Sequence, residues 1–292
     1  MKLFSYRDAT SIRCGVEAEG ITYDTSALFP RYDSNFLGRG GLEALAEALA
    51  RQDAGLRQLD DTPSTLVAPF ALPSKIVCVG LNYADHARET GANIPEEPIL
   101  FMKSTTSFSG PFDPVMIPRD SLKTDWEVEL AVVIGRKTRY VSPTDANSCI
   151  AGYCVHNDLS ERAFQLERGG TWDKGKGCDT FAPMGPYLVT PEEVGDVHQK
   201  AIWLSLNGKR MQNSRTDNLL FKVPELISYI SRFMTLLPGD IISTGTPPGV
   251  GLGLQPPLYL KAGDIMELGI EGLGTQRQEV IAFSADYAVP EY

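Results

Sequence analysis

The sequence predicts an α+β fold that is mostly β: a β-sandwich or rolled barrel preceded by a small N-terminal α+β domain. Three observations support this prediction. Many short apolar runs alternate with turns rich in glycine and proline, and the helical segments are few and short. Residues 1–72 carry their own pattern of strands and a helix, and residues 73–292 would form the larger β-roll domain with the candidate site residues.

The N-terminal unit is expected to pair short strands with one good helix. Strands are predicted at 3–7, 13–17 and 21–23. The helix is predicted at 42–51, where Ala and Leu recur at helical spacing. The following stretch contains Pro63, Pro69 and Pro73 and has the character of a linker, which places the domain boundary near residue 72.

The remainder of the chain is dominated by strand signals. The predicted strands are 75–80, 98–103, 128–134, 150–157, 201–206, 240–243, 264–270 and 278–283. Asn207 and Gly208 predict a tight hairpin turn. The predicted helices are 82–90, 160–166 and 223–234, the last with Pro224 in its first turn, where proline is tolerated.

The overall composition excludes several classes of protein. A net charge of −10 argues against a nucleic-acid partner, because phosphate neutralisation needs clustered Lys and Arg. The five cysteines include no Cys-x-x-Cys pair, which argues against a disulfide framework or a zinc site and fits a cytoplasmic protein. The N-terminus lacks the apolar core of a signal peptide, and no apolar run is long enough to span a bilayer, so no membrane partner is expected.

Three acidic residues lie within or at the ends of segments with strand character. Glu127 and Glu129 are two residues apart, so their side chains point to the same face of a strand, and Asp158 follows the next apolar run. Such acids need neutralisation, which a hard divalent cation supplies, and the pattern predicts Mg²⁺, with Mn²⁺ or Ca²⁺ as alternatives. The other interpretations are a solvated sheet face or a softer metal bound with Cys154 and His156.

Two further motifs are candidates for catalysis. His86 and Glu89 are three residues apart in an expected helix, where the carboxylate would orient a general base; the alternative is an incidental surface pair. Lys174 and Lys176 lie in a glycine-rich loop that either approaches an anionic ligand or is simply solvated. The segment 243–253 is glycine-rich but interrupted by prolines and starts no helix, so it predicts a loop that cradles a carboxylate, not a dinucleotide site.

In combination these motifs resemble the fumarylacetoacetate hydrolase family, and the resemblance extends from about residue 73 to the C-terminus. The matching segments, in order, are 75–89, 126–134, 152–162, 172–183 and 241–251. The resemblance implies a mixed β-roll or sandwich core, usually in a homodimer. One departure is Leu81, where many relatives carry Arg, so a charge contact from that position is missing.

The resemblance also implies roles for individual residues. They are Glu127, Glu129 and Asp158 for Mg²⁺ or Mn²⁺, His86 and Glu89 for a water-activating dyad, Gln165 and Lys176 for substrate contact, and Thr246 for the loop that holds the acid end of the substrate. Lys176 is also expected to stabilise the charge that develops during the reaction.

The expected activity is metal-dependent hydrolysis of a carbon–carbon bond in a 2,4-diketo acid, a small oxo-acid of the kind derived from sugar acids. The same metal platform also suits an oxo-acid decarboxylase or isomerase, a fumarylpyruvate or acylpyruvate hydrolase, or a ureidoglycolate lyase. The pair His86 and Glu89 favours hydrolysis, because a hydrolase needs an activated water. A protein that binds a dicarboxylate without turnover is the alternative from a different class.

Overall fold

Strand β11 (Val128–Ile134) lies at the centre of the molecule, and every one of its residues is buried. The computed structural model describes residues 1–9, 11–85 and 95–288. Side chains on β11 alternate between two cores: Leu130 and Val132 join the cluster beneath the second sheet, whereas Ala131 and Val133 join the cluster on the opposite face. Such a strand has no solvated face, so any charged side chain on it requires a partner.

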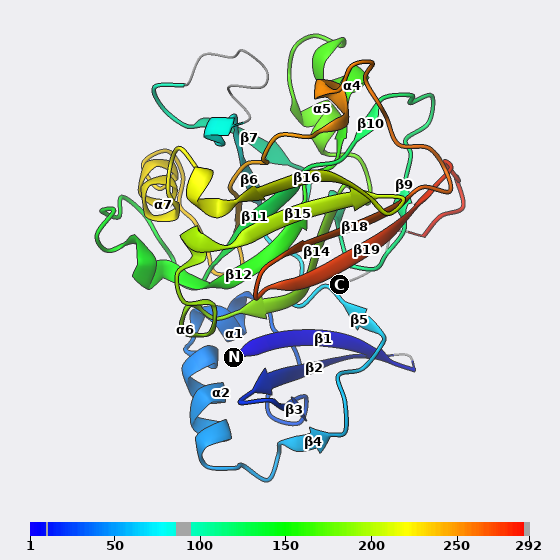
Figure 1. Ribbon diagram of the computed structural model, residues 1–292. Coiled ribbons are helices and arrows are strands. Elements are labelled where there is room, and N and C mark those ends of the chain that lie inside the picture. The colour runs from blue at the N-terminus through cyan, green and yellow to red at the C-terminus, as the bar shows by residue number, and fades with distance from the viewer. Residues whose placement is uncertain (10, 86–94, 289–292) are drawn as a thin grey trace.

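The largest sheet has twelve strands and runs through the whole molecule (Figure 1). Its order is β4 (Arg57–Leu59), β3 (Ile21–Asp24), β2 (Ser11–Ala18), β1 (Lys2–Asp8), β14 (Ala182–Val189), β12 (Ile150–Asn157), β11, β17 (Ile241–Ser243), β6 (Ile76–Gly80) and β7 (Ile99–Lys103), while β5 (Leu66–Val67) pairs with β1 and β8 (Phe108–Ser109) with β14. The β11 neighbours β12 and β17 are both antiparallel to it. This arrangement places the ends of β11, β12 and β17 beside one another.

Two smaller sheets complete the β structure. The five-stranded sheet has the order β16 (Lys209–Arg215), β15 (Ala201–Leu206), β18 (Ile265–Ile270), β19 (Gly274–Ile281) and β9 (Val115–Met116). It packs over β11 and β12, and apolar residues of both sheets form the main core between them. A two-stranded sheet pairs β10 (Thr124–Asp125) with β13 (Ser160–Glu161), immediately before β11 and after β12.

The helices are short and lie at the edges of the sheets. The α-helices described are α1 (Ser34–Gly38), α2 (Gly41–Ala50), α4 (Arg162–Leu166), α5 (Asp173–Lys176), α6 (Pro191–Val194) and α7 (Val223–Ile230), and the 3₁₀ turns are η1 (Thr105–Ser107), η2 (Ala146–Cys149), η3 (Val197–Gln199), η4 (Thr216–Asn218) and η5 (Gly251–Gly253). Helices α1 and α2 lie beside the N-terminal strands, whereas α4 and α5 lie at the opposite end of the molecule (Figure 1). The prediction of an α+β, mostly β fold is confirmed.

The N-terminal unit continues into the rest of the sheet. Strand β1 pairs with β14, and Leu3, Cys14 and Leu45 share one apolar cluster with Ala131 and Val133 of β11. The division into domains 1–72 and 73–292 stays a prediction. Both the hydrogen-bonded ladder and the apolar core cross that boundary.

Several sequence predictions require correction. The helix expected at 223–234 ends at Ile230, and residues 160–161 of the expected helix 160–166 form β13 instead. The expected strand 278–283 is β19, which spans Gly274–Ile281. Its polar residues Gln276 and Gln278 point inward and are buried. Most of the helix expected at 82–90 falls outside the described residues. Strand β14 was not predicted, and the expected glycine-rich loop contains α5.

Two expectations from composition can be compared directly with the structure. All five cysteines lie in the described ranges and are free. Across those same ranges, no helix has the length and apolar character needed to cross a membrane.

Candidate metal centre and active-site pocket

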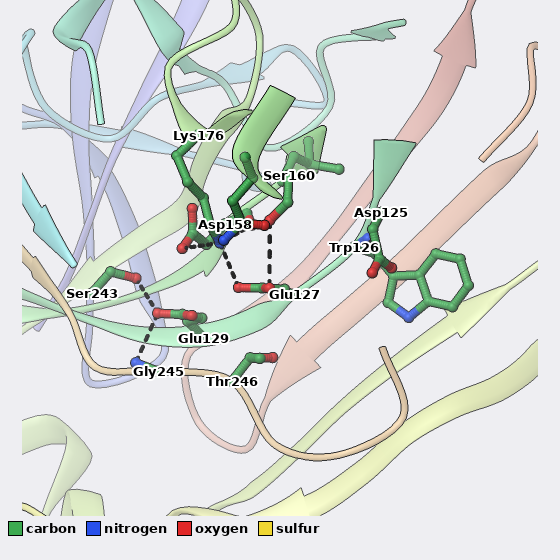
Figure 2. A network of polar contacts seen from close by, with 12 residues as sticks. Asp125, Trp126, Glu127, Glu129, Asp158, Ser160, Lys176, Ser243, Gly245 and Thr246 are labelled. Atoms are coloured by element: carbon green, nitrogen blue, oxygen red, sulfur yellow. Dashed lines mark hydrogen bonds and ion pairs between the residues drawn. The ribbon is translucent and has the colours of Figure 1, made fainter. Parts of the chain in front are cut away.

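The three acids predicted from the sequence converge at the ends of β11 and β12. Glu129 lies directly opposite His156 in the antiparallel ladder, and the Asp158 N–H donates a 2.8 Å hydrogen bond to the Glu127 carbonyl oxygen. One carboxylate oxygen from each of Glu127, Glu129 and Asp158 lies within 4.8 Å of the others. All three side chains are buried, and Figure 2 shows them grouped around one point. The alternative of a solvated face is therefore wrong for these acids.

Buried cations neutralise two of these carboxylates. The ammonium of Lys176 on α5 lies 2.7 Å from Glu127 Oε2 and 2.7 Å from Asp158 Oδ2, so it bridges the two acids (Figure 2). Lys103 at the end of β7 contacts the other oxygen of Asp158 at 2.7 Å, and Arg162 on α4 contacts Glu127 Oε1 at 2.7 Å. Each of these cations is itself buried, so the pairing neutralises the cations as well as the carboxylates.

The pKa values of the acids diverge because their partners differ. Burial by itself raises the pKa of Glu127, but Lys176 and Arg162 outweigh it and leave that pKa below its ordinary value. Burial is likewise outweighed at Asp158, where Lys103 and Lys176 hold the pKa low. At Glu129, burial and the neighbouring Asp158 raise the pKa well above its ordinary value. Glu129 is thus the acid that most needs a further positive charge in order to ionise.

Hydrogen bonds fix one oxygen of Glu129. The Ser243 hydroxyl on β17 donates to Glu129 Oε2 at 2.5 Å, and the Gly245 N–H donates to the same oxygen at 2.8 Å. His156 Nδ1 lies 2.6 Å from Ser243 Oγ, behind the carboxylate. Among the described residues, the group of converging ligand atoms includes neither His156 nor Cys154. The structure therefore does not support the softer metal site.

This donor set fits a hard divalent cation. All its ligand atoms are carboxylate oxygens, which Mg²⁺, Mn²⁺ and Ca²⁺ accept. Two ligands on opposite sides of Mg²⁺ lie roughly 4.2 Å apart, twice the usual Mg–O distance, so a group contained within 4.8 Å has the right scale. The ion would also supply the positive charge that Glu129 lacks.

Glu127 and Glu129 line a cavity of about 460 Å³, and Asp158 contacts Lys176, which also lines it. The predicted substrate residues Gln165, Lys176 and Thr246 all line it. Gln165 Oε1 accepts a 3.0 Å hydrogen bond from Arg162, and the Thr246 hydroxyl donates to the Val128 carbonyl oxygen at 2.9 Å. The cavity lining thus combines two of the converging acids with the cations Arg162 and Lys176.

The predicted dyad, His86 and Glu89, lies outside the described residues. The described residue just before them is Asp85, whose carboxylate accepts a hydrogen bond from the Ser214 hydroxyl at 2.7 Å. The roles of both dyad residues stay predictions.

Sequence reasoning missed four residues of the site. Lys103 and Arg162 neutralise the acids, Ser243 positions Glu129, and Asp125 pairs with Arg162 at 2.8 Å while accepting a 2.7 Å hydrogen bond from the Gly251 N–H. A signal was available for the cations, because a Lys that ends an apolar strand and an Arg four residues after a buried Asp both need an acidic partner. Ser243 begins the segment 243–253, which was predicted to cradle a carboxylate, but its hydrogen bond to Glu129 was not predicted.

Comparisons with known proteins identify the family of the chain. The model of the fumarylacetoacetate (FAA) hydrolase C-terminal family matches residues 75–281. A 2,4-didehydro-3-deoxy-L-rhamnonate hydrolase from Sphingomonas sp. is 50% identical over 266 residues, which cover 91% of this chain and 90% of that protein. The crystallised fumarylacetoacetate hydrolase of Exiguobacterium antarcticum superposes with a TM-score of 0.84 at 34% identity, over 97% of this chain and 100% of that one.

A maleylpyruvate hydrolase from Sphingobium sp. SYK-6, solved in complex with manganese(II) and pyruvate, superposes with a TM-score of 0.78 at 28% identity, over 97% of this chain and 100% of that one. The family model covers most of the chain. The matched residues include the converging acids Glu127, Glu129 and Asp158 and the lysine that bridges two of them, Lys176. The chain therefore belongs to the fumarylacetoacetate hydrolase family and is an enzyme that hydrolyses carbon–carbon bonds.

Proposed function

We propose that this enzyme hydrolyses the C3–C4 bond of a 2,4-diketo acid in a reaction that depends on a divalent cation. The observation that carries the proposal is the buried group Glu127, Glu129 and Asp158, of which the two glutamates line a cavity, with Lys176 beside them. The 50% identical relative named 2,4-didehydro-3-deoxy-L-rhamnonate hydrolase supports 2,4-diketo-3-deoxy-L-rhamnonate as the substrate. The products would be pyruvate and L-lactate.

The three acids would hold Mg²⁺, the cation we favour over Mn²⁺ and Ca²⁺. When bound, the ion would supply a Lewis acid and a template for the oxo-acid end of the substrate. Ser243 and the Gly245 N–H keep Glu129 oriented for this role, because they fix one of its oxygens and leave the other free to turn toward the cavity.

Side chains of the enzyme would transfer the proton and stabilise the charge that develops during the reaction. His86, oriented by Glu89, would take a proton from water, and the resulting hydroxide would attack the C4 carbonyl; such acid–base help contributes about 10²–10⁴-fold in rate. Breakage of C3–C4 would leave C4 as the carboxyl carbon of the second acid and negative charge on the pyruvate enolate, which the ammonium of Lys176 would stabilise. Protonation of this enolate at C3, by the proton taken from water, would then give pyruvate. Gln165 and Thr246 line the same cavity and would contact the substrate.

The variant His86→Ala tests the proposal. We expect it to abolish pyruvate release and to leave Mg²⁺ binding intact, measured by calorimetry. His198→Ala is the control, because His198 lies on η3 and is not among the described residues that line the cavity. Near-wild-type turnover by the His86 variant would show that the dyad assignment is wrong.

Mass spectrometry of the products distinguishes the reactions that share this platform. Two acids indicate hydrolysis, carbon dioxide indicates decarboxylation of an oxo-acid such as oxaloacetate, and an unchanged mass indicates isomerisation. Ureidoglycolate belongs in the same substrate panel. The homodimer and the cytoplasmic location also stay predictions, and sedimentation velocity measures the first of these.

A further inference from the structure

Besides the acids, the cavity has a lining of apolar side chains. Leu81, Phe101 and Trp172 belong to it together with Leu166, Val250 and Leu252. Lys176 Nζ lies 5.1 Å from the centroid of the Phe101 ring, so this apolar lining begins beside the acids. The rings of Phe101 and Trp172 meet edge to face with centroids 5.2 Å apart. We use the name apolar wall for Leu81, Phe101 and Trp172.

Leu81 is held in the apolar wall by its backbone. Its φ is +53°, in the left-handed region that bulky residues rarely adopt, so the surrounding structure must fix it there. The next residue, Asn82, supplies this restraint, since its amide donates to the Thr244 carbonyl oxygen at 2.7 Å and to that of Phe221 at 3.1 Å. The preceding Gly80 lies against Trp172, because a Cβ at that position would stand 2.7 Å from the indole ring.

Both cations that line the described part of the cavity, Arg162 and Lys176, are paired with buried acids. Lys176 Nζ is held beside the acids by two carboxylates and the Asp158 carbonyl oxygen. Arg162 donates from Nε to Asp125 and from Nη1 to Gln165, and its Nη2 pairs with Asp125 and Glu127. Among the described residues that line the cavity, a second carboxylate at the far end of a substrate would therefore meet apolar side chains and no cation that is free of an acidic partner.

We infer that the apolar wall selects 2,4-diketo acids that end in a methyl or short alkyl group and rejects those that carry a second, distal carboxylate. The inference rests on the proposed function and deepens it by naming the substrate class. Burying an unpaired carboxylate against apolar side chains is costly, whereas a methyl group gains by the same contact. The terminal methyl of a 6-deoxy sugar acid meets this requirement.

A matched pair of substrates tests the inference on the wild-type enzyme. 2,4-Dioxoheptanoate and 2,4-dioxoheptanedioate differ only in whether carbon 7 is a methyl group or a carboxylate, and both release pyruvate on hydrolysis. We expect kcat/KM to be about 10²-fold higher for the methyl-ended acid, measured by coupled reduction of pyruvate. A ratio below about 10 overturns the inference while leaving the hydrolase proposal standing. Release of pyruvate from neither acid refutes both.

A cation placed in the apolar wall tests the assignment to these residues. Leu81→Lys should lower the ratio of kcat/KM values by at least about 10-fold, because the new ammonium can pair with the distal carboxylate. Ile99→Lys is the control: Ile99 lies beside Gly80 in the β6–β7 ladder and is not among the cavity residues. An unchanged ratio in Leu81→Lys overturns the assignment. Should that variant fail to fold, the wild-type ratio still decides the inference.

Discussion

Replacing Lys176 by methionine removes the ammonium that bridges two buried carboxylates. The side chain is 2% exposed, and its nitrogen lies 2.7 Å from both Glu127 and Asp158. Burial by itself lowers the pKa of Lys176, but Asp158 and Glu127 outweigh it and raise that pKa, so the group is charged throughout the neutral range. Methionine keeps most of the apolar length of the side chain and removes only the charge.

The structure sets the size of the expected effect. Removing one partner of a buried ion pair costs about 3–5 kcal/mol. Lys103 still contacts Asp158 and Arg162 still contacts Glu127 in the variant, so we expect the lower end, about 3 kcal/mol, in the free energy of unfolding. A divalent cation should restore part of this loss, because it replaces the missing charge. The wild type also gains from the cation, so the deficit shrinks only by the difference in binding free energy, about 1.4 kcal/mol for each tenfold tighter Kd in the variant.

Urea unfolding followed by circular dichroism measures both effects, first with EDTA and then with saturating MgCl₂. The deficit of Lys176→Met should shrink by at least half when Mg²⁺ is added, while hydrolysis stays lost. Lys174→Met is the matched control, since Lys174 lies on the same helix but is exposed and contacts only a backbone carbonyl among the described residues. A deficit that Mg²⁺ does not change would refute the argument that Lys176 and the cation neutralise the same acids.

Two further predictions concern other parts of the structure. Ser243→Ala should weaken Mn²⁺ binding about 10–100-fold in calorimetry, because it frees the Glu129 oxygen, whereas the equally buried Ser231→Ala should not. Asp24→Asn should lower the free energy of unfolding by about 1–2 kcal/mol at pH 7: burial raises the pKa of Asp24, but Arg13 and Tyr6 outweigh it and leave that pKa below its ordinary value. Stability from this group is therefore complete above about pH 4 and is lost as the pH falls toward the folded-state pKa, so the difference between the two proteins should shrink in urea unfolding below pH 4.

The acidic part of the site could be predicted because strand geometry is local. Glu127 and Glu129 are two positions apart, so their side chains lie on one face of the strand. The antiparallel pairing of β11 with β12 brings Asp158 close to both of them. Lys176 was expected in a loop, because Gly175 and Gly177 flank it and disfavour a helix. In the structure that turn is helical, and Gly175 is required for close packing, since a Cβ there would stand 2.5 Å from the Glu161 carbonyl oxygen.

Strand β14 could not be predicted because its sequence contradicts the usual signals for a central strand. Pro183 and Pro186 cannot donate to the ladder, and prolines normally exclude such a position. A buried side chain compensates: Gln276 on β19 donates to the carbonyl oxygens of Val155 and Gly185 at 2.7 and 3.0 Å. The partner is about ninety residues away in the sequence, so no local pattern could reveal it.

The need to neutralise buried charge explains why the acids of the site could be recognised in the sequence, whereas their cationic partners could not. A carboxylate on an apolar strand stands out at once, and it cannot remain buried without positive charge nearby. The charges come from three separate elements: Lys103 from β7, Arg162 from α4 and Lys176 from α5. Only Glu129 is left to neutral donors, and its raised pKa marks where the positive charge is still incomplete. Charge balance thus points to the same position for the divalent cation as the geometry of the ligands does.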